Sequence, residues 1–335
     1  MAADLRKIKD FFFSPLCPPT VLQVSSSYLS GIHMDVKDGR AKRHVILELP
    51  TGLLEPHFDR KNIDDAAALS GVLKEGLRQL QVSGKKIACL LPEACFKILV
   101  IPFDSIPSSE KEREKTIRWR AKKQMAILPE DTRLTYEMIA GASSIKVMAA
   151  LARTPVIREY EDLFAGLGLE VGIATAPTVS LLNLVDWEDE KDILVANIEE
   201  ESLGVIAVTQ AEPALYRLKT FPVGREDGLR LRQKIEAVVN EIENTAHFIE
   251  DHEKREVRAL WFRSGLRKGQ EDILAGLKTA LPFEVRAIQA PPSFGLAPES
   301  SAFLAPLAGQ VPRQRNISAG RQRDKSPSWS FLKRH

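Results

Sequence analysis

Val21-Leu22-Gln23-Val24-Ser25, near the start of the chain, and Val195-Ala196-Asn197-Ile198-Glu199, 174 positions later, are two short apolar runs that end in polar residues. Each run opens the same succession: three strand-like segments, a helix-like segment and one more apolar strand. The first copy has strands at 21–24, 28–36 and 44–49, a helix with Leu69, Leu73, Leu77 and Leu80 on one face, and a strand at 87–91. The second copy has strands at 193–198, 202–209 and 215–221, a helix at 225–250 and a strand at 257–262. Because the pattern occurs twice, the sequence predicts an α/β protein with two similar lobes that face a cleft.

The segment between the two copies predicts an inserted subdomain. Its expected elements are strands at 96–101, 134–138 and 146–152, a helix that Ser109 and Glu112 open with a capping box and Pro129 closes, and a helix at 155–167. In the first lobe, Asn62 with Asp65 three residues later predicts the cap of the leucine-rich helix. The predicted units are an amphipathic or disordered segment at 1–18, a first lobe at 19–95 rejoined by 170–190, the insertion at 96–169, a second lobe at 191–310 with a short helix at 300–308, and a basic disordered tail at 311–335.

Composition indicates a globular protein of a reducing compartment. The 335 residues are 44% hydrophobic and 27% charged, which suffices for a large core in two lobes. The formal net charge of +2 gives no overall field that would favour nucleic acid. The cysteines Cys17, Cys89 and Cys95 form no CxxC pair, and no run approaches the roughly 20 apolar residues of a membrane helix or the core of a signal peptide. The chain is therefore expected in the cytoplasm.

Three stretches carry a resemblance to a known family. They are Lys74-Glu75-Gly76-Leu77 to Gly84-Lys85-Lys86-Ile87 with Leu91-Pro92, then Ile101 to Pro107 with Thr116-Ile117-Arg118-Trp119-Arg120-Ala121 and Leu128-Pro129-Glu130-Asp131, and finally Ala149 to Leu169. In this order and spacing they resemble the PilM family of type IV pilus assembly proteins and, more distantly, the cell-division protein FtsA. The resemblance covers roughly residues 20 to 310 and implies a two-lobed actin-like (ribonuclease H-like) fold with the insertion in the first lobe.

The same resemblance implies a nucleotide site, which this sequence has altered. Actin-like ATPases hold magnesium and ATP between two strand hairpins that each carry an Asp-x-Gly, since the aspartate organises the hydrated metal and the glycine lets backbone N–H groups approach the phosphates. Here the hairpins offer Gln23-Val24-Ser25 and Asn197-Ile198-Glu199, and the loop expected after strand 257–262 is Arg263-Ser264-Gly265-Leu266-Arg267. Repulsion between phosphates and Glu199, Glu200 and Glu201 is expected to cost several kcal/mol.

The pocket is therefore predicted to be degenerate, without ATP hydrolysis and with at most weak nucleotide or magnesium binding. Its predicted positions are Gln23, Ser25, Ser26, Asn197, Glu199, Ser202, Ser264 and Gly265. No P-loop, GxGxxG, HExxH or paired-cysteine motif is present, and the six histidines are scattered. No catalytic or metal-ligating residue is predicted. The turn Ser25-Ser26-Ser27 either cradles an anion or simply connects two strands.

Interaction surfaces are expected in the insertion and at the chain ends. The resemblance places the groove for the N-terminal cytoplasmic peptide of a PilN-like inner-membrane protein near Ile117 to Glu130, with Arg118, Trp119 and Glu130 as motif matches. The helix there is basic on its other faces, which are either binding surfaces or simply solvated. The N-terminal segment with Leu5, Ile8, Phe11 and Phe12 among basic residues, and the basic tail with Trp329, Phe331 and Leu332, either touch anionic lipid or are frayed termini.

Together with the altered pocket, the resemblance implies a non-catalytic cytoplasmic scaffold, peripheral to the inner membrane, that gathers pilus assembly components and also contacts the pilus assembly ATPase. Two alternatives stay open. One is a nucleotide-binding actin-like ATPase, and the other is the cytoplasmic module of a type II secretion platform.

Overall fold

The computed structural model describes residues 17–35, 40–82, 84–125, 127–140, 145–185, 191–222 and 231–311. The predictions for the N-terminal segment and for the basic tail lie outside the described residues, apart from Cys17, Pro18 and Val311. Among the described residues, no helix is long and apolar enough to cross a membrane.

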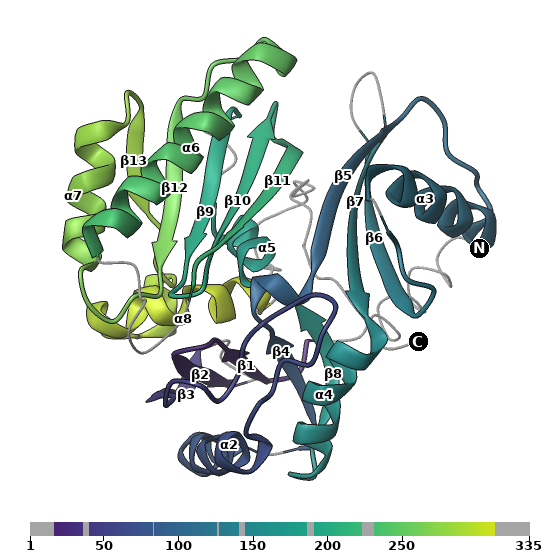
Figure 1. The fold of residues 1–335 in the computed structure, drawn as a ribbon. Helices are drawn as coiled ribbons and strands as arrows, with labels where there is room; N and C mark the ends of the chain where they lie inside the picture. Colours follow the sequence, from purple (N-terminus) through teal and green to yellow (C-terminus); the bar gives the residue numbers. More distant parts are fainter. Residues whose placement is uncertain are drawn as a thin grey trace, which may run out of the picture.

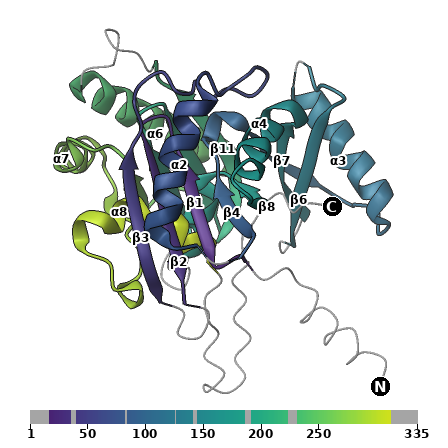
Figure 2. The same cartoon turned by 90° about the horizontal axis from the view of Figure 1, so that it is seen from below.

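The first lobe is a five-stranded sheet in the order β3-β2-β1-β4-β8. Its strands are β1 (Thr20–Val24), β2 (Tyr28–Met34), β3 (Ala41–Glu48), β4 (Lys86–Leu90) and β8 (Glu170–Thr175). β1 pairs antiparallel with β2 and parallel with β4. Helices α2 (Ala66–Leu80) and α4 (Thr154–Ala165) cover its outer face, as Figures 1 and 2 show from two directions.

The second lobe repeats this plan in the order β11-β10-β9-β12-β13. Its strands are β9 (Ile193–Ile198), β10 (Ser202–Thr209), β11 (Glu212–Thr220), β12 (Ala259–Ser264) and β13 (Glu284–Ala287). Helices α6 (Leu231–Glu253) and α7 (Gln270–Ala280) lie on its outer face. The helices α5 (Pro177–Leu181) and α8 (Pro298–Gln310) lie between the two sheets. The described residues also include the short 3₁₀ turns η1 (Glu93–Cys95), η2 (Leu182–Leu184) and η3 (Pro292–Phe294).

The internal repeat is visible in the strand pairing itself. Gln23 pairs with Ser30 across β1 and β2, and Asn197 pairs with Gly204 across β9 and β10. Both pairs differ by the 174 positions that relate the two apolar runs of the sequence. The prediction of two similar lobes is therefore confirmed at the level of individual residues.

The inserted subdomain is a three-stranded antiparallel sheet, β5-β7-β6, with one helix on it. Its elements are β5 (Lys97–Phe103), α3 (Glu110–Gln124), β6 (Thr132–Ala140) and β7 (Ile145–Arg153). Ile117 and Ala121 of α3 are fully buried against the sheet. The prediction that Pro129 closes this helix is wrong: the helix ends at Gln124, five residues earlier, where Met125 has extended backbone and its amide donates to the Ala121 carbonyl at 3.0 Å.

Two predicted caps differ from the structure. The cap of α2 is Asp65, whose side chain accepts a hydrogen bond from the Ala68 amide at 2.9 Å, so Asn62 does not cap the helix. Asn62 is instead fully buried, where it accepts from the His57 amide and donates to the Cys95 sulfur. Ser109 occupies the cap position of α3 but makes no side-chain capping bond.

Candidate functional site

The two amide side chains that replace the expected aspartates lie between the lobes. Gln23 belongs to β1 and Asn197 to β9, and both are essentially inaccessible to solvent. The Gln23 Nε2 atom donates to a carboxylate oxygen of Glu199 at 2.7 Å, which connects the first lobe to the second. The predicted positions Gln23, Asn197 and Glu199 are therefore brought together.

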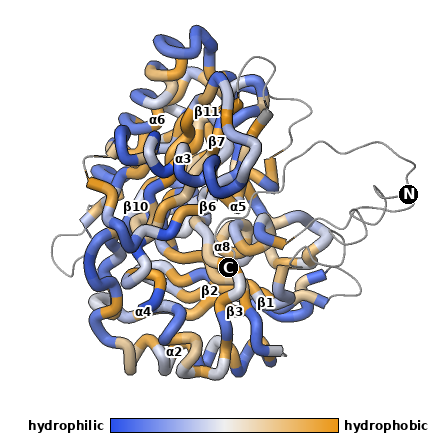
Figure 3. Tube along the Cα trace, turned by 90° about the vertical axis from the view of Figure 1, so that its right-hand side faces the viewer, coloured by the Kyte–Doolittle hydropathy of each residue, from blue (hydrophilic) through white to orange (hydrophobic). Residues whose placement is uncertain are grey.

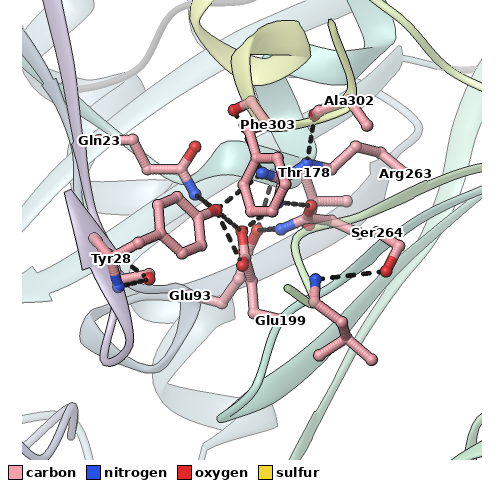
Figure 4. Close-up of polar contacts among 12 residues, drawn as sticks. Gln23, Tyr28, Glu93, Thr178, Glu199, Arg263, Ser264, Ala302 and Phe303 are labelled. Atoms are coloured by element: carbon pink, nitrogen blue, oxygen red, sulfur yellow. Dashed lines mark hydrogen bonds and ion pairs between the residues drawn. The ribbon is translucent and has the colours of Figure 1, made fainter. Parts of the chain in front are cut away.

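Glu199 is the centre of this buried cluster (Figure 4). Its carboxylate forms an ion pair with Arg263 and accepts from the Tyr28 hydroxyl at 2.8 and 2.9 Å. The Tyr28 hydroxyl in turn accepts from Gln23 at 2.9 Å and from Arg263 at 2.7 Å. Side chains from β1, β2 and β12 thus converge on a single carboxylate that follows β9, and Asn197 of β9 joins them through Arg263. We call Gln23, Tyr28, Asn197, Glu199 and Arg263 the interlobe cluster.

Arg263 lies in a strand and not in the loop that the sequence predicted. β12 continues through Ser264, where Arg263 pairs with Asn197 across the sheet. Its guanidinium donates to the Asn197 side-chain oxygen at 3.0 Å and to the carbonyl oxygens of Ala302 and Phe303 in α8 at 2.8 and 3.2 Å. Since every N–H direction has an acceptor, a buried charge at this position is fully hydrogen-bonded.

The charges in the cluster stabilise each other. Burial alone would lower the pKa of Arg263, but the Glu199 carboxylate and Tyr28 beside it raise that pKa above the usual arginine value. Burial raises the pKa of Tyr28 well above that of a free phenol. The raised pKa values keep Arg263 charged and the Tyr28 phenol neutral, and Arg263 forms its ion pair with the Glu199 carboxylate.

A second carboxylate, Glu93 of η1, joins the lobes nearby. One oxygen accepts from the Thr178 amide at 2.6 Å and from its hydroxyl, and the other accepts from the Tyr216 hydroxyl of β11 at 2.7 Å. Asn197 approaches the same carboxylate at 3.5 Å. Burial raises the pKa of Glu93 in spite of these hydrogen bonds.

The three consecutive glutamates do not form the shared negative surface that the sequence predicted. Glu199 is neutralised by Arg263, while Glu200 is largely exposed and pairs with Lys234 at 3.0 Å. Glu201 is 4% exposed and accepts from the Ser26 hydroxyl at 2.6 Å and from the Ser26 amide at 3.3 Å. Burial, followed by the charge of Glu199, raises the pKa of Glu201 to about 7. Each carboxylate therefore has its own partner.

The remaining predicted pocket positions have local structural contacts. The Ser25 hydroxyl donates to the Tyr28 carbonyl and accepts from the amides of Tyr28 and Ser27, which is the hydrogen-bonding pattern of a strand-connecting turn. Ser264 accepts from the Leu266 amide, and the buried Ser202 hydroxyl has no hydrogen-bond partner among the described residues. Neither serine contacts the interlobe cluster through its hydroxyl.

These residues do not fit a magnesium triphosphate. A Cβ atom added at Gly265 would overlap the side chains of Glu199 and Arg263, so even a methyl group finds no space on this side of the cluster. A hydrated divalent cation requires carboxylates with free charge, whereas Glu199 is paired with Arg263 and the Gln23 and Asn197 amides donate to carboxylates. Among the described residues, no three His, Cys, Asp or Glu side chains form a group that could hold a metal ion.

A groove of about 800 Å³ lies beside this site and is lined by both lobes and the start of the inserted subdomain. We call it the interlobe groove. Its lining combines apolar and charged residues: Thr51, Gly52, Leu54, Glu55, Pro56, His57, Phe58, Arg60, Asp64, Ala94, Lys97, Glu201, Leu218, Thr220, Phe221 and Pro222. Glu201 belongs both to this lining and to the contact with Ser26, so the groove and the lobe junction share a residue.

The residues predicted to bind a partner peptide lie elsewhere. Arg118 donates to the Thr132 carbonyl at 2.9 Å and pairs with Glu114, while Trp119 is 53% exposed and Glu130 is exposed in the turn before β6. None of these three residues lines the interlobe groove. Their role in partner binding stays a prediction.

Sequence reasoning missed Tyr28, Glu93 and Thr178 as members of the site, and it assigned Arg263 to a loop. A signal for Arg263 was present, because Ala259, Trp261 and Arg263 alternate with Leu260 and Phe262 along one strand. An arginine at the end of this alternation lies on the same face of the sheet as Ala259 and Trp261, and here that face is turned toward the cleft between the lobes. For Glu93, which follows the Leu91-Pro92 turn, the sequence contains no comparable pattern.

Comparison with known proteins defines the class of the fold. No family model matches the chain, and none of the curated proteins is detectably similar to it in sequence. Solved structures do match, and the two facing sheets with helices between and outside them form a two-lobed actin-like fold, as predicted.

Among the structures similar to this chain is a PilM–PilN type IV pilus biogenesis complex, with 18% identity, 89% of this chain and 100% of that chain covered, and a TM-score of 0.69. A protein from Bacteroides thetaiotaomicron VPI-5482 with an actin-like ATPase fold and unknown function shares 9% identity over 80% and 89% of the chains, with a TM-score of 0.49. The cytoplasmic domain of EpsL, an inner-membrane component of the type II secretion system of Vibrio cholerae, shares 10% identity over 74% and 83%, with a TM-score of 0.47.

Proposed function

We propose that this chain is a non-catalytic adaptor of a type IV pilus assembly complex that binds the cytoplasmic peptide of a PilN-like membrane protein. The observation that carries the proposal is the Glu199–Arg263 pair, which occupies the place between the hairpins where an ATPase of this fold would hold its nucleotide. The likeness to the chain of a PilM–PilN complex supports the choice of partner.

The interlobe cluster gives the adaptor a fixed shape without a ligand. In an actin-like ATPase the nucleotide bridges the two lobes, whereas here Gln23 and Tyr28 of one lobe bind Glu199 of the other directly. Ser26 and Glu201 add a second bridge at the edge of the interlobe groove. A groove formed by two lobes in a fixed relation is preorganised, so a peptide loses less free energy in ordering the site.

The interlobe groove suits an extended peptide. Leu54, Phe58 and Leu218 offer apolar contacts, and Lys97 and Glu201 offer charges of both signs. We therefore place the PilN-like peptide in this groove, where it would contact both lobes and the inserted subdomain at once.

The first test concerns the partner peptide. Thr220 is exposed at the end of β11 and lines the groove, so Thr220→Arg adds a long charged side chain at the groove without changing the core. We expect this change to weaken binding of the N-terminal peptide of the neighbouring membrane protein by at least about tenfold in a calorimetric titration.

The matched control is Thr279→Arg, which makes the same change on the exposed surface of α7 and should leave the affinity unchanged. If Trp119→Ala abolishes binding while Thr220→Arg does not, the peptide lies on α3 and the groove is excluded. If no such peptide binds the unmodified protein, the adaptor proposal is wrong.

The second test concerns nucleotide. Titration of the full chain with magnesium and ATP is expected to give no saturable heat, because the ligand would have to displace a buried ion pair and bring phosphates next to Glu199. Phosphate release should equal that of a sample without protein. Tight binding with measurable turnover would contradict the proposal and favour the actin-like ATPase.

A further inference from the structure

The inserted subdomain carries the exposed large hydrophobic side chains of the described residues. They are Trp119 with 53% of its surface exposed, Ile127 with 77% and Met138 with 44%. Trp119 lies on α3 and Ile127 follows the end of that helix, while Met138 lies on β6 with its sulfur 3.3 Å from Arg113 of α3. Apolar exposure is thus concentrated around one helix rather than scattered over the surface.

Cations surround this apolar surface. Four basic side chains of α3 are exposed: Lys115, Arg120, Lys122 and Lys123. Within the part of the chain that the structure describes, none of them forms an ion pair. The Lys123 amine lies 3.8 Å from the centre of the Trp119 ring, and the Arg120 guanidinium lies 5.8 Å from it. Figure 3 shows α3 on the outside of the subdomain as a largely hydrophilic helix. We call Lys115, Trp119, Arg120, Lys122, Lys123 and Ile127 the α3 anchor face.

The contrast with Arg118 on the same helix is informative. Arg118 is neutralised by Glu114 and donates to the backbone of β6, so it serves the packing of the subdomain. The carboxylates of α3 lie in its first half, at Glu110, Glu112 and Glu114, whereas residues 118–123 contain cations and no carboxylate. The half of the helix that carries Trp119 and leads to Ile127 therefore contains cations and no carboxylate.

We propose that the α3 anchor face binds an anionic lipid surface. Lysine and arginine attract acidic headgroups, and tryptophan is the side chain that most favours the boundary between headgroups and acyl chains. The exposed Ile127, which follows the helix, finds an apolar partner in the acyl chains but none in a polyanion such as nucleic acid. The face is part of a helix surface and not of the interlobe groove, which suits a broad planar partner. This inference rests on α3 alone and does not depend on the adaptor function.

Vesicle binding of the full-length protein tests the inference. We expect flotation with vesicles of phosphatidylcholine and phosphatidylglycerol but not with phosphatidylcholine alone, and weaker binding at high salt. The double variant Lys122→Gln/Lys123→Gln should lower the partition coefficient by about 30-fold. Lys85→Gln/Lys86→Gln removes the same charge from the exposed start of β4 and the residue before it, and should leave binding nearly unchanged.

Fluorescence locates the contact. Brominated lipids should quench part of the tryptophan emission of the bound protein, and Trp119→Phe should remove that quenching. Equal partitioning of the Lys122/Lys123 variant and the unmodified protein would overturn the inference, and so would binding that does not require phosphatidylglycerol. Capture of an acidic peptide or of single-stranded nucleic acid on this face, without vesicle binding, would also overturn it. Loss of binding to the PilN-like peptide affects none of these results, so the two proposals fail separately.

Discussion

Replacing Arg263 by alanine is expected to lower the free energy of unfolding by about 3–5 kcal/mol, because it leaves the Glu199 carboxylate buried without its counter-charge. Glu199 is only 2% exposed, so its carboxylate cannot reach solvent while the two lobes are in contact. The same change removes the donors that satisfy the Ala302 and Phe303 carbonyls, which weakens the attachment of α8 to the second lobe. Chemical denaturation of the two proteins at the same pH measures the loss.

Two variants control for the removal of an arginine as such. Arg232 of α6 is 91% exposed and pairs with Glu236, so Arg232→Ala should change stability by no more than about 0.5 kcal/mol. The double variant Arg263→Met/Glu199→Gln leaves no charge in the interlobe cluster and should recover much of the loss, since the amide oxygen of the new side chain can still accept from Tyr28 and Gln23. If Arg263→Ala is no more harmful than Arg232→Ala, the ion pair does not hold the lobes together.

The architecture could be predicted because it is repeated. Two apolar runs 174 positions apart predicted two equivalent hairpins, and the pairs Gln23–Ser30 and Asn197–Gly204 confirm the register. The hydrophobic periodicity of the sequence predicted which segments form helices and strands, but not the residues at which they begin and end. The capping pattern at Asn62 was overridden by tertiary contacts, since a fully buried amide bonded to Cys95 and the His57 backbone is worth more there than at a helix terminus.

The candidate site was predicted only in part, because a linear sequence shows charges without their partners. The resemblance identified Gln23, Asn197 and Glu199 as neighbours, and the structure brings them together. The prediction that Glu199 carries an unpaired negative charge was wrong. Its partners Arg263 and Tyr28 lie 64 and 171 positions away from Glu199 in the sequence, so a local pattern does not reveal them. The run of three glutamates therefore suggested an accumulated negative charge, whereas folding gives each carboxylate a separate partner.

Stability is expected to fall as the pH rises through the range in which Glu201 ionises in the unfolded chain but not in the folded one. The pKa of Glu201 is raised from 4.5 to about 7, first by burial and then by the charge of Glu199, while the hydrogen bonds from Ser26 act in the opposite direction. Below pH 4.5 both states carry the proton, and above pH 7 neither does. Between these values only the folded protein binds it, so ionisation favours the unfolded state.

The size of the effect follows from the shift. A difference of about 2.5 pKa units corresponds to about 3 kcal/mol of stability that is present at pH 4.5 and lost by pH 8. Lowered pKa values, such as that of Asp192 beside Arg255, act at more acidic pH and in the opposite sense. The lowered pKa of His33 also opposes the trend, so the measurement compares the unmodified protein with a Glu201 variant instead of relying on one pH profile.

Glu201→Gln is the appropriate variant, because its amide oxygen can accept from the Ser26 hydroxyl but carries no titrating proton. Denaturation at several pH values should show that the variant gains about 3 kcal/mol relative to the unmodified protein between pH 4.5 and pH 8. Because Glu201 also lines the interlobe groove, the gain would mean that the junction of the lobes is held most tightly when this carboxyl is neutral. A difference between the two proteins that stays constant with pH would show that Glu201 is ionised in the folded state throughout, and that water reaches it through the groove.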